Sequence, residues 1–240
     1  MDRLFISDLH LDEAHPATTR ALLRFLETHC HTGDELYILG DLFEAWLGDD
    51  DDSAFAQRVA DALAASSRAG VHIHLMQGNR DLLLGRRFAQ RAGATLLPDP
   101  CPCLFDGHRV LLAHGDALCS ADRGYQRYRR FMRSPATRAV LLALPLSLRR
   151  RIASKLRSSS RTHTAAKAAP LLDVVTATVE AELARHGTEL LIHGHTHRPA
   201  RHAHANGTRF VLGDWDGDSA RYLRWPSGGE PQLLEFAVGR

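Results

Sequence analysis

The stretch LFISDLH at residues 4–10 decides the fold, because an apolar run of strand length ends directly in residues that carry chemistry. Leu4–Ile6 forms the run, and Asp8 and His10 follow it. Successive side chains of a strand point to opposite faces, so we expect these two, which are two residues apart, to face the same side. The stretch therefore predicts a strand that delivers a carboxylate and an imidazole to one site.

Similar apolar runs return along the chain, at Leu36–Leu39, Val71–Met76, Val110–Ala113, Leu190–Ile192 and Phe210–Leu212. Between the early runs the sequence is typical of helices, at Thr18–Cys30, Ala54–Ala69 and Leu83–Ala92. This alternation predicts an α/β fold. Two last runs, Arg221–Trp225 and Gln232–Val238, follow without helices between them, so we expect Phe210–Leu212 and these two to be antiparallel strands that complete a sheet.

A histidine, carboxylate or amide follows nearly every core run. Beyond Asp8 and His10 these residues are Asp41, Asn79, His114, His195 and His197. Folds of this class bind ligands at the carboxyl ends of their strands, so we expect all seven at one edge of the sheet. Two metal ions about 3.5–4 Å apart, bridged by a carboxylate, would use all seven donors, whereas one tetrahedral ion would not.

Charge is distributed unevenly along the chain, although the net charge is only +2. Residues 123–172 hold thirteen Lys or Arg and no Asp or Glu, and the remainder holds 17 basic against 28 acidic residues. Such a block suggests an anionic partner, namely a phosphate-bearing substrate, a membrane surface or nucleic acid. A solvated, Arg-rich face is the alternative.

The basic block coincides with a change in pattern. Its helical stretches are broken by Pro135 and Pro145, and its apolar run Ala139–Leu148 is too short to span a bilayer. Basic residues flank this run, at Arg138, Arg149, Arg150 and Arg151. The pattern suits an interfacial helix or a lipid-facing cap, but a helix packed on the body would look similar. We expect residues 1–121 and 171–240 to form the core, and residues 122–170 to form the cap.

No window has the roughly 18 consecutive apolar residues of a membrane span, and MDRLFISDLH does not resemble a signal peptide. We therefore expect a cytoplasmic protein. The four cysteines, which we expect to be reduced thiols, are Cys30, Cys101, Cys103 and Cys119.

The motifs DxH, GD, GNR, H and GHxH occur in this order over residues 8–197, and this series resembles the calcineurin-like metallophosphoesterase family. GDLFEAWLGDDDD at 40–52 and GNRD at 78–81, with the basic insert, are similar to the branch that hydrolyses UDP-2,3-diacylglucosamine in lipid A biosynthesis. The resemblance implies an αββα sandwich with a helical cap and two Mn²⁺ ions. One ion would be held by Asp8, His10, Asp41 and His197, and the other by Asp41, Asn79, His114 and His195. Asp41 would bridge them, and the same donors also suit Fe²⁺, Co²⁺ or Zn²⁺.

The resemblance also implies a reaction and a place for it. Metal-activated water would attack the uridine-side phosphorus and release UMP and 2,3-diacylglucosamine 1-phosphate, at the anionic cytoplasmic face of the inner membrane. We expect a peripheral, monomeric enzyme that does not bind nucleic acid. The implied catalytic residues are Asp41, Asn79, Arg80, His114 and His195.

Arg80 is consistent with a diphosphate substrate. Many members of the family have His at this position, whereas a guanidinium stays charged and cannot donate a proton. A phosphate leaving group needs no acid, and the planar guanidinium suits bidentate phosphate contact. The alternative is that Arg80 pairs only with Asp81 or another nearby carboxylate.

Substrate contacts are expected partly in the cap. Arg157, Ser160, Thr164 and Lys167 would share one face if that stretch is helical. The resemblance implies contacts to the glucosamine and its phosphate from Asp122, Ser160, Thr164 and Lys167, together with Asn79, Arg80 and His195. The family often has Asn where this chain has Thr164. Tyr125, Tyr128 and Phe131 are spaced to form an aromatic wall for acyl chains or a small core within the cap.

Two other functions fit parts of the pattern. A metallophosphoesterase for a cyclic nucleotide or a phosphoprotein would use the same metal donors, but a small soluble substrate would not need a basic and apolar cap. A nucleic-acid-binding module would use the basic block. That block, however, mixes arginines with apolar residues and contains no RNP or zinc-finger motif.

Overall fold

The first strand explains how the molecule is layered. In the computed structural model, which describes residues 1–154, 173–216 and 219–237, β1 (Asp2–Ile6) is buried on both faces. Leu4 and Ile6 pack against helices on one side, whereas Phe5 packs against a second sheet on the other. Burial of both faces is the reason that the run is apolar throughout.

Two sheets stack face to face. Sheet one has the order β11-β10-β1-β2-β3-β4, and sheet two has the order β5-β6-β7-β9-β8. The strands of sheet one after β1 are β2 (Glu35–Leu39), β3 (His72–Met76), β4 (Ala94–Leu97), β10 (Ser219–Pro226) and β11 (Gln232–Ala237). Those of sheet two are β5 (Cys101–Phe105), β6 (His108–Ala113), β7 (Leu190–His193), β8 (Ala200–His204) and β9 (Gly207–Val211).

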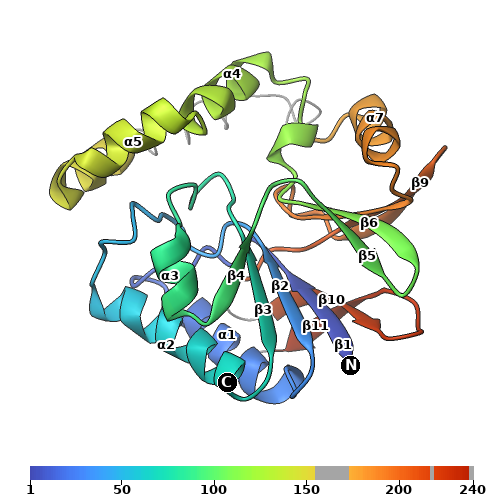
Figure 1. Cartoon of the computed structure of the whole chain (residues 1–240), viewed down its shortest axis with the longest axis horizontal. Helices are drawn as coiled ribbons and strands as arrows, with labels where there is room; N and C mark the ends of the chain where they lie inside the picture. The colour runs from blue at the N-terminus through green and yellow to red at the C-terminus, as the bar shows by residue number, and fades with distance from the viewer. Residues whose placement is uncertain (155–172, 217–218, 238–240) are drawn as a thin grey trace.

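Helices cover both outer faces, so the predicted αββα sandwich is confirmed (Figure 1). α1 (Pro16–His29), α2 (Ala54–Arg68) and α3 (Arg86–Arg91) pack on sheet one, and α7 (Thr176–His186) packs on sheet two. α2 begins where Ser53 caps it, with its Oγ accepting a hydrogen bond from the N–H of Ala56 at 3.2 Å.

Parallel pairing brings the functional strand ends together. β1, β2 and β3 run parallel in sheet one, and β6 and β7 run parallel in sheet two. Within each set the carboxyl ends therefore lie at one edge. Between the sheets, Phe5 stacks on Tyr37 at 4.9 Å between ring centroids and lies 6.0 Å from Phe105.

The prediction for the last strands is wrong in one respect. We expected one sheet to hold the runs after residue 210, but β9 pairs with β7 in sheet two, while β10 and β11 extend sheet one beside β1. The chain crosses between sheets after β9, and no local pattern marks that crossing. β8 was also missed, because its sequence ARHAH is a polar strand at an edge of sheet two.

The described part of the predicted cap is helical and lies outside the two-sheet sandwich. η1 (Asp116–Leu118) leads into α4 (Arg123–Met132) and α5 (Pro135–Ala143), which lie across one end of the body, and residues 146–154 are again helical (Figure 1). The boundaries of the cap remain a prediction, since residues 155–172 lie outside the described part. Within the described ranges, no helix combines the length and the apolar character needed to cross a bilayer.

The packing of Phe5 between the sheets leads to a stability prediction. Phe5→Ala should lower the free energy of unfolding by about 3–5 kcal/mol, because it opens a cavity in the interior. Urea denaturation of the variant measures this change. Leu104→Ala, at a position that is 68% exposed on β5, is the matched control and should change stability by less than about 0.5 kcal/mol. Equal losses for the two variants would contradict this packing.

Candidate metal centre

All seven predicted donors directly follow core strands. Asp8 and His10 follow β1, Asp41 follows β2 and Asn79 follows β3. His114 follows β6, and His195 and His197 follow β7. We predicted that all seven donors lie at one edge of a single sheet, and this prediction was too simple. The donors follow the carboxyl ends of strands in both sheets, at the place where the two sheets meet.

The backbone, and not strand alternation, aims these side chains. Five of the seven donors have positive φ angles, which are 57° at Asp8, 49° at His10, 52° at Asp41, 68° at His195 and 54° at His197. The argument from alternating strand faces is therefore wrong, since these residues lie beyond the strands in left-handed turns. Residues other than glycine rarely adopt this conformation, and each costs about 1–3 kcal/mol. The surrounding fold evidently imposes it.

One group of donors consists of Asp8, His10 and His197. His197 Nε2 lies 3.3 Å from His10 Nε2 and 3.4 Å from Asp8 Oδ1. His197 Nδ1 lies 3.1 Å from a carboxylate oxygen of Asp214, which holds the proton on Nδ1 and leaves Nε2 free as a donor to a metal. This group has the geometry to hold a divalent cation.

A second group consists of Asp8, Asp41 and His114. His114 Nε2 lies 3.8 Å from Asp41 Oδ1 and 2.9 Å from Asn79 Oδ1, so Asn79 joins the group. His114 Nδ1 lies 3.0 Å from the carbonyl oxygen of Leu39, which again directs Nε2 toward the site. The ring of His195 lies 5.1 Å from that of His114.

Both groups share Asp8, whereas the resemblance implied Asp41 as the bridge. Asp41 also reaches both sides, because its Oδ2 lies 4.0 Å from His10 Nδ1 and its Oδ1 lies 3.8 Å from His114 Nε2. The bridging role of Asp41 stays a prediction.

Unpartnered polar atoms show that the cluster fits a cation. Asp8 is fully buried, and its Oδ2 accepts hydrogen bonds from Ser7 Oγ at 2.6 Å and from the N–H of His195 at 2.8 Å. Asp8 Oδ1 and His10 Nδ1 are buried with no hydrogen-bond partner. Such atoms are costly to bury, and a divalent cation that suits mixed oxygen and nitrogen donors would satisfy them.

The protonation of the cluster supports the same conclusion. Burial raises the pKa of Asp41 to about 7, although the nearby His114 acts to lower it. Burial lowers the pKa of His114, but the charges of Asp41 and Asp116 act in the opposite direction and the value rises to about 9. Burial lowers the pKa of His10 to about 3. Without a cation, the carboxylates and imidazoles thus share protons that a bound metal would displace.

Asp81 holds the loops and does not pair with Arg80. Its carboxylate accepts hydrogen bonds from the N–H groups of Gly78 at 2.7 Å and Leu42 at 2.8 Å. Arg80 instead donates to Glu44 at 2.5 Å, and its Nε lies 3.7 Å from Asp41 Oδ2. Pairing with another nearby carboxylate is therefore observed, while the Arg80 side chain stays 37% exposed beside the metal donors.

Three residues near the donors were missed by the sequence reasoning. Glu44 lies 3.7 Å from His10 Nδ1, Asp214 contacts His197, and Asp81 holds the turn before Asn79. Glu44 and Asp81 fall inside the motifs at 40–52 and 78–81, so their positions were a signal. Asp214 follows a core run in the same way as the predicted donors do.

The cap contacts the body next to the donors. Tyr125 of α4 stacks near His195 with ring centroids 6.2 Å apart, and its hydroxyl donates to the buried Asp116 at 3.0 Å. Arg129 donates to Asp116 at 2.8 Å, and Arg133 lies 3.2 Å from Asp99. These arginines therefore face the body and are not free to bind an external anion.

The predicted substrate contacts are only partly described. Asp122 caps α4, with its Oδ1 accepting from the N–H of Tyr125 at 3.0 Å. Ser160, Thr164 and Lys167 lie outside the described residues, as does Arg157. Of the predicted aromatic wall, only Tyr125 packs against the metal donors, while the side chains of Tyr128 and Phe131 are exposed.

Comparisons with known proteins agree with this geometry. The family model described as "Calcineurin-like phosphoesterase" matches residues 1–199. A protein of Aromatoleum aromaticum named UDP-2,3-diacylglucosamine hydrolase is 48% identical over 242 residues, covering 99% of this chain and 98% of that protein. One of the same name from Pseudomonas paraeruginosa is 50% identical over 220 residues, covering 90% and 92%. The solved structure of an archaeal phosphodiesterase matches with a TM-score of 0.50 at 11% identity, covering 98% of this chain and 100% of that chain, and so supports the fold alone.

Close backbone approach at Gly78 leads to a prediction about metal affinity. A Cβ there would lie 2.1 Å from Asp41 Oδ1 and 2.4 Å from the backbone N of Asp41. Gly78→Ala should therefore displace Asp41 and weaken Mn²⁺ binding by about 10- to 100-fold, as measured by calorimetric titration of folded protein. Gly124→Ala, where the nearest atom is 3.5 Å from the added Cβ, should leave the affinity unchanged. Equal affinities for the two variants would contradict this geometry.

Proposed function

The chain belongs to the calcineurin-like phosphoesterase family, and from this premise we propose that it hydrolyses the diphosphate bond of UDP-2,3-diacylglucosamine. The products would be UMP and 2,3-diacylglucosamine 1-phosphate, a step of lipid A biosynthesis. The observation that carries the proposal is the cluster of seven metal donors directly beside the contact between cap and body. Near-full-length similarity to hydrolases named for this substrate supports it.

We propose two Mn²⁺ ions per chain, held by the seven donors with Asp41 between them. When bound, the cations would supply an activated water and neutralise charge on the attacked phosphate. The two overlapping donor groups and the unpartnered Asp8 Oδ1 support two positions. We also propose a monomeric enzyme, since seven donors from a single chain suffice for this site.

The catalytic residues Asp41, Asn79, Arg80, His114 and His195 would act on the diphosphate as follows. Arg80 remains charged, and the part of its guanidinium that is not bound to Glu44 would hold a phosphate oxygen. Asn79 and His195 are donors that come from opposite sheets, so they would also fix the phosphate between the sheets. Arg80 cannot donate a proton, and a departing phosphate does not need one.

The orientation of the substrate is proposed from the position of the cap. In-line attack on the uridine-side phosphorus requires that the leaving sugar phosphate point away from the metal donors. α4 lies beside His195 through Tyr125, so the leaving group would point toward the cap. Asp122, Ser160, Thr164 and Lys167 would contact the sugar and its phosphate there.

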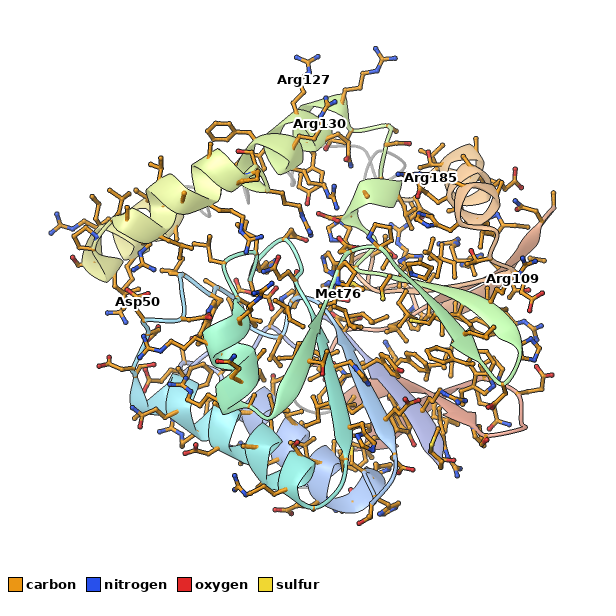
Figure 2. The ribbon with its side chains drawn as sticks, viewed as in Figure 1. Asp50, Met76, Arg109, Arg127, Arg130 and Arg185 are labelled. Carbon is orange, nitrogen blue, oxygen red and sulfur yellow. The ribbon has the colours of Figure 1, made fainter. Side chains whose placement is uncertain are left out.

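We further propose that the enzyme is peripheral on the anionic inner membrane, and that the outer side of the cap makes the contact. Arg127 and Arg130 of α4 are exposed on the side of the cap that faces away from the body (Figure 2). Phe131, the chain neighbour of Arg130, is exposed as well. Arg149, which flanks the apolar run Ala139–Leu148, is buried at 3% exposure and forms a bidentate pair with Asp50. At Arg149 the alternative of a helix packed on the body therefore holds, and this arginine is not part of the proposed membrane surface.

The reaction itself is tested by isotope labelling. Hydrolysis of UDP-2,3-diacylglucosamine in ¹⁸O-labelled water should place the label in UMP, as read by mass spectrometry. Label in the diacylglucosamine phosphate would reverse the proposed orientation, and no hydrolysis by the metal-loaded protein would refute the proposed function.

The requirement for metal is tested on the same substrate. Chelation should abolish turnover, and Mn²⁺ should restore it. Asp41→Asn should lower kcat/KM by at least about 100-fold, because it removes a charge that both ions would share. Asp61→Asn, at an exposed position on α2, is the control and should be neutral. Full activity in excess chelator is the outcome that would refute the metal requirement.

Membrane attachment is tested by co-sedimentation with liposomes that contain anionic lipid. Replacing Arg127 and Arg130 with Ser should weaken binding roughly 30-fold at low salt, since each basic residue near such a surface contributes about 1 kcal/mol. The matched control is Arg185→Ser on the exposed side of α7. If both proteins sediment like the unaltered chain, the outer side of the cap does not face the membrane.

A further inference from the structure

A cavity of about 210 Å³ lies on the outer face of sheet two, next to the metal centre. Arg209 of β9 lines it, together with Thr196 and Arg198 from the loop after β7 and Asp173 ahead of α7. Thr196 and Arg198 are the chain neighbours of the metal donor His197. The described lining includes none of the seven metal donors, so this cavity is a separate site.

Arg209 is a buried cation whose described partners are imidazoles. The residue is only 7% exposed, its Nε donates to His204 Nε2 at 3.3 Å, and its Nη1 lies 3.3 Å from His193 Nε2. His193 Nδ1 lies 2.8 Å from the carbonyl oxygen of Gly194, so Nδ1 carries the hydrogen and Nε2 accepts from Arg209. Within the described ranges, Arg209 forms no ion pair with a carboxylate.

This arrangement leaves charge and hydrogen-bonding capacity unused. A guanidinium has five N–H donors, and Nη2 of Arg209 has no acceptor among the described residues. Burial lowers the pKa of Arg209 and the charge of Asp173 raises it, but a guanidinium remains charged in either case. Buried charges are ordinarily paired, so an unpaired one that lines a cavity indicates a missing anion.

The other polar groups of the cavity favour an anion as well. Asp173 is already bound to Arg198, which donates to it at 2.6 Å. The charged lining therefore consists of two arginines and one carboxylate, with a net charge of +1. Thr196 also lines the cavity, although its Oγ1 is buried and has no hydrogen-bond partner.

We propose that this cavity binds a small anion of the phosphate-monoester class. The planar guanidinium of Arg209 would make the charge-assisted contact, and Arg198 would contribute a second cation at the rim. Pro199 and Val211 give the cavity an apolar side for the organic part of the ester. The volume is below the roughly 300–1,000 Å³ typical of drug-sized ligands, so a diacylated nucleotide sugar is too large.

Two sources share this chemistry, namely inorganic phosphate and the UMP released by the proposed reaction. Metal-free protein, kept in chelator so that the metal centre cannot hold phosphate, is titrated with each by calorimetry. We expect one binding site per chain for both probes. Tighter binding of UMP identifies a nucleotide site, and equal binding means that the phosphoryl group alone is recognised.

Variants test whether phosphate and UMP bind in this cavity. Arg209→Gln keeps hydrogen-bond donors but removes the charge, and it should weaken binding of both probes at least about tenfold. The control is Arg109→Gln, at an exposed position on β6 of the same sheet, labelled in Figure 2, and it should bind like the unaltered protein. Should Arg209→Gln fail to fold, Arg198→Gln at the exposed rim is expected to weaken binding several-fold.

Two results would overturn the proposal. One is that neither probe binds the metal-free protein, and the other is that the folded Arg209 and Arg198 variants bind as tightly as the unaltered chain. Because the titrations use no metal and no turnover, their outcome is independent of whether the chain hydrolyses UDP-2,3-diacylglucosamine.

Discussion

The structure depends on burying several carboxylates at the point where two sheets meet. Asp8, Asp41 and Asp81 are each at most 2% exposed, and such groups are stable only with charge-assisted contacts. Asp81 is satisfied by backbone N–H groups, so it stabilises the loops. Asp8 keeps an unpartnered oxygen that faces imidazoles. These buried negative charges destabilise the protein when no metal is bound. The same charges would attract divalent cations to the site.

The two-sheet sandwich makes it possible to gather these buried carboxylates in one place. Strands that are apolar on both faces keep the sheets rigid and packed, and their parallel ends bring distant turns together. Left-handed turns then aim Asp8, His10 and Asp41, and glycines such as Gly78 and Gly194 let the turns approach to contact distance. A Cβ on Gly194 would lie 2.2 Å from Asp8 Oδ2. Backbone strain and glycine positions are therefore part of the site and not of the fold alone.

The sequence allowed the seven candidate donors to be located because they follow five apolar runs, which is a local signal. It did not allow their mutual arrangement to be predicted, because Asp8 and His195 meet through a hydrogen bond between residues 187 apart. The burial of Arg149 depends likewise on Asp50, 99 residues away, so a basic flank that is typical of a membrane surface packs inward. Asp214 follows an apolar run as the predicted donors do and could have been found by that signal, whereas the polar edge strand β8 carries no pattern that separates it from a surface loop.

The two-metal assignment is tested most directly by a crystal structure of the Mn²⁺-loaded protein with an anomalous difference map. Two peaks about 3.5–4 Å apart are expected, with Asp41 between them. His10 and His197 should lie beside one peak, and Asn79 and His114 beside the other. A single peak, or peaks away from these donors, would contradict the assignment.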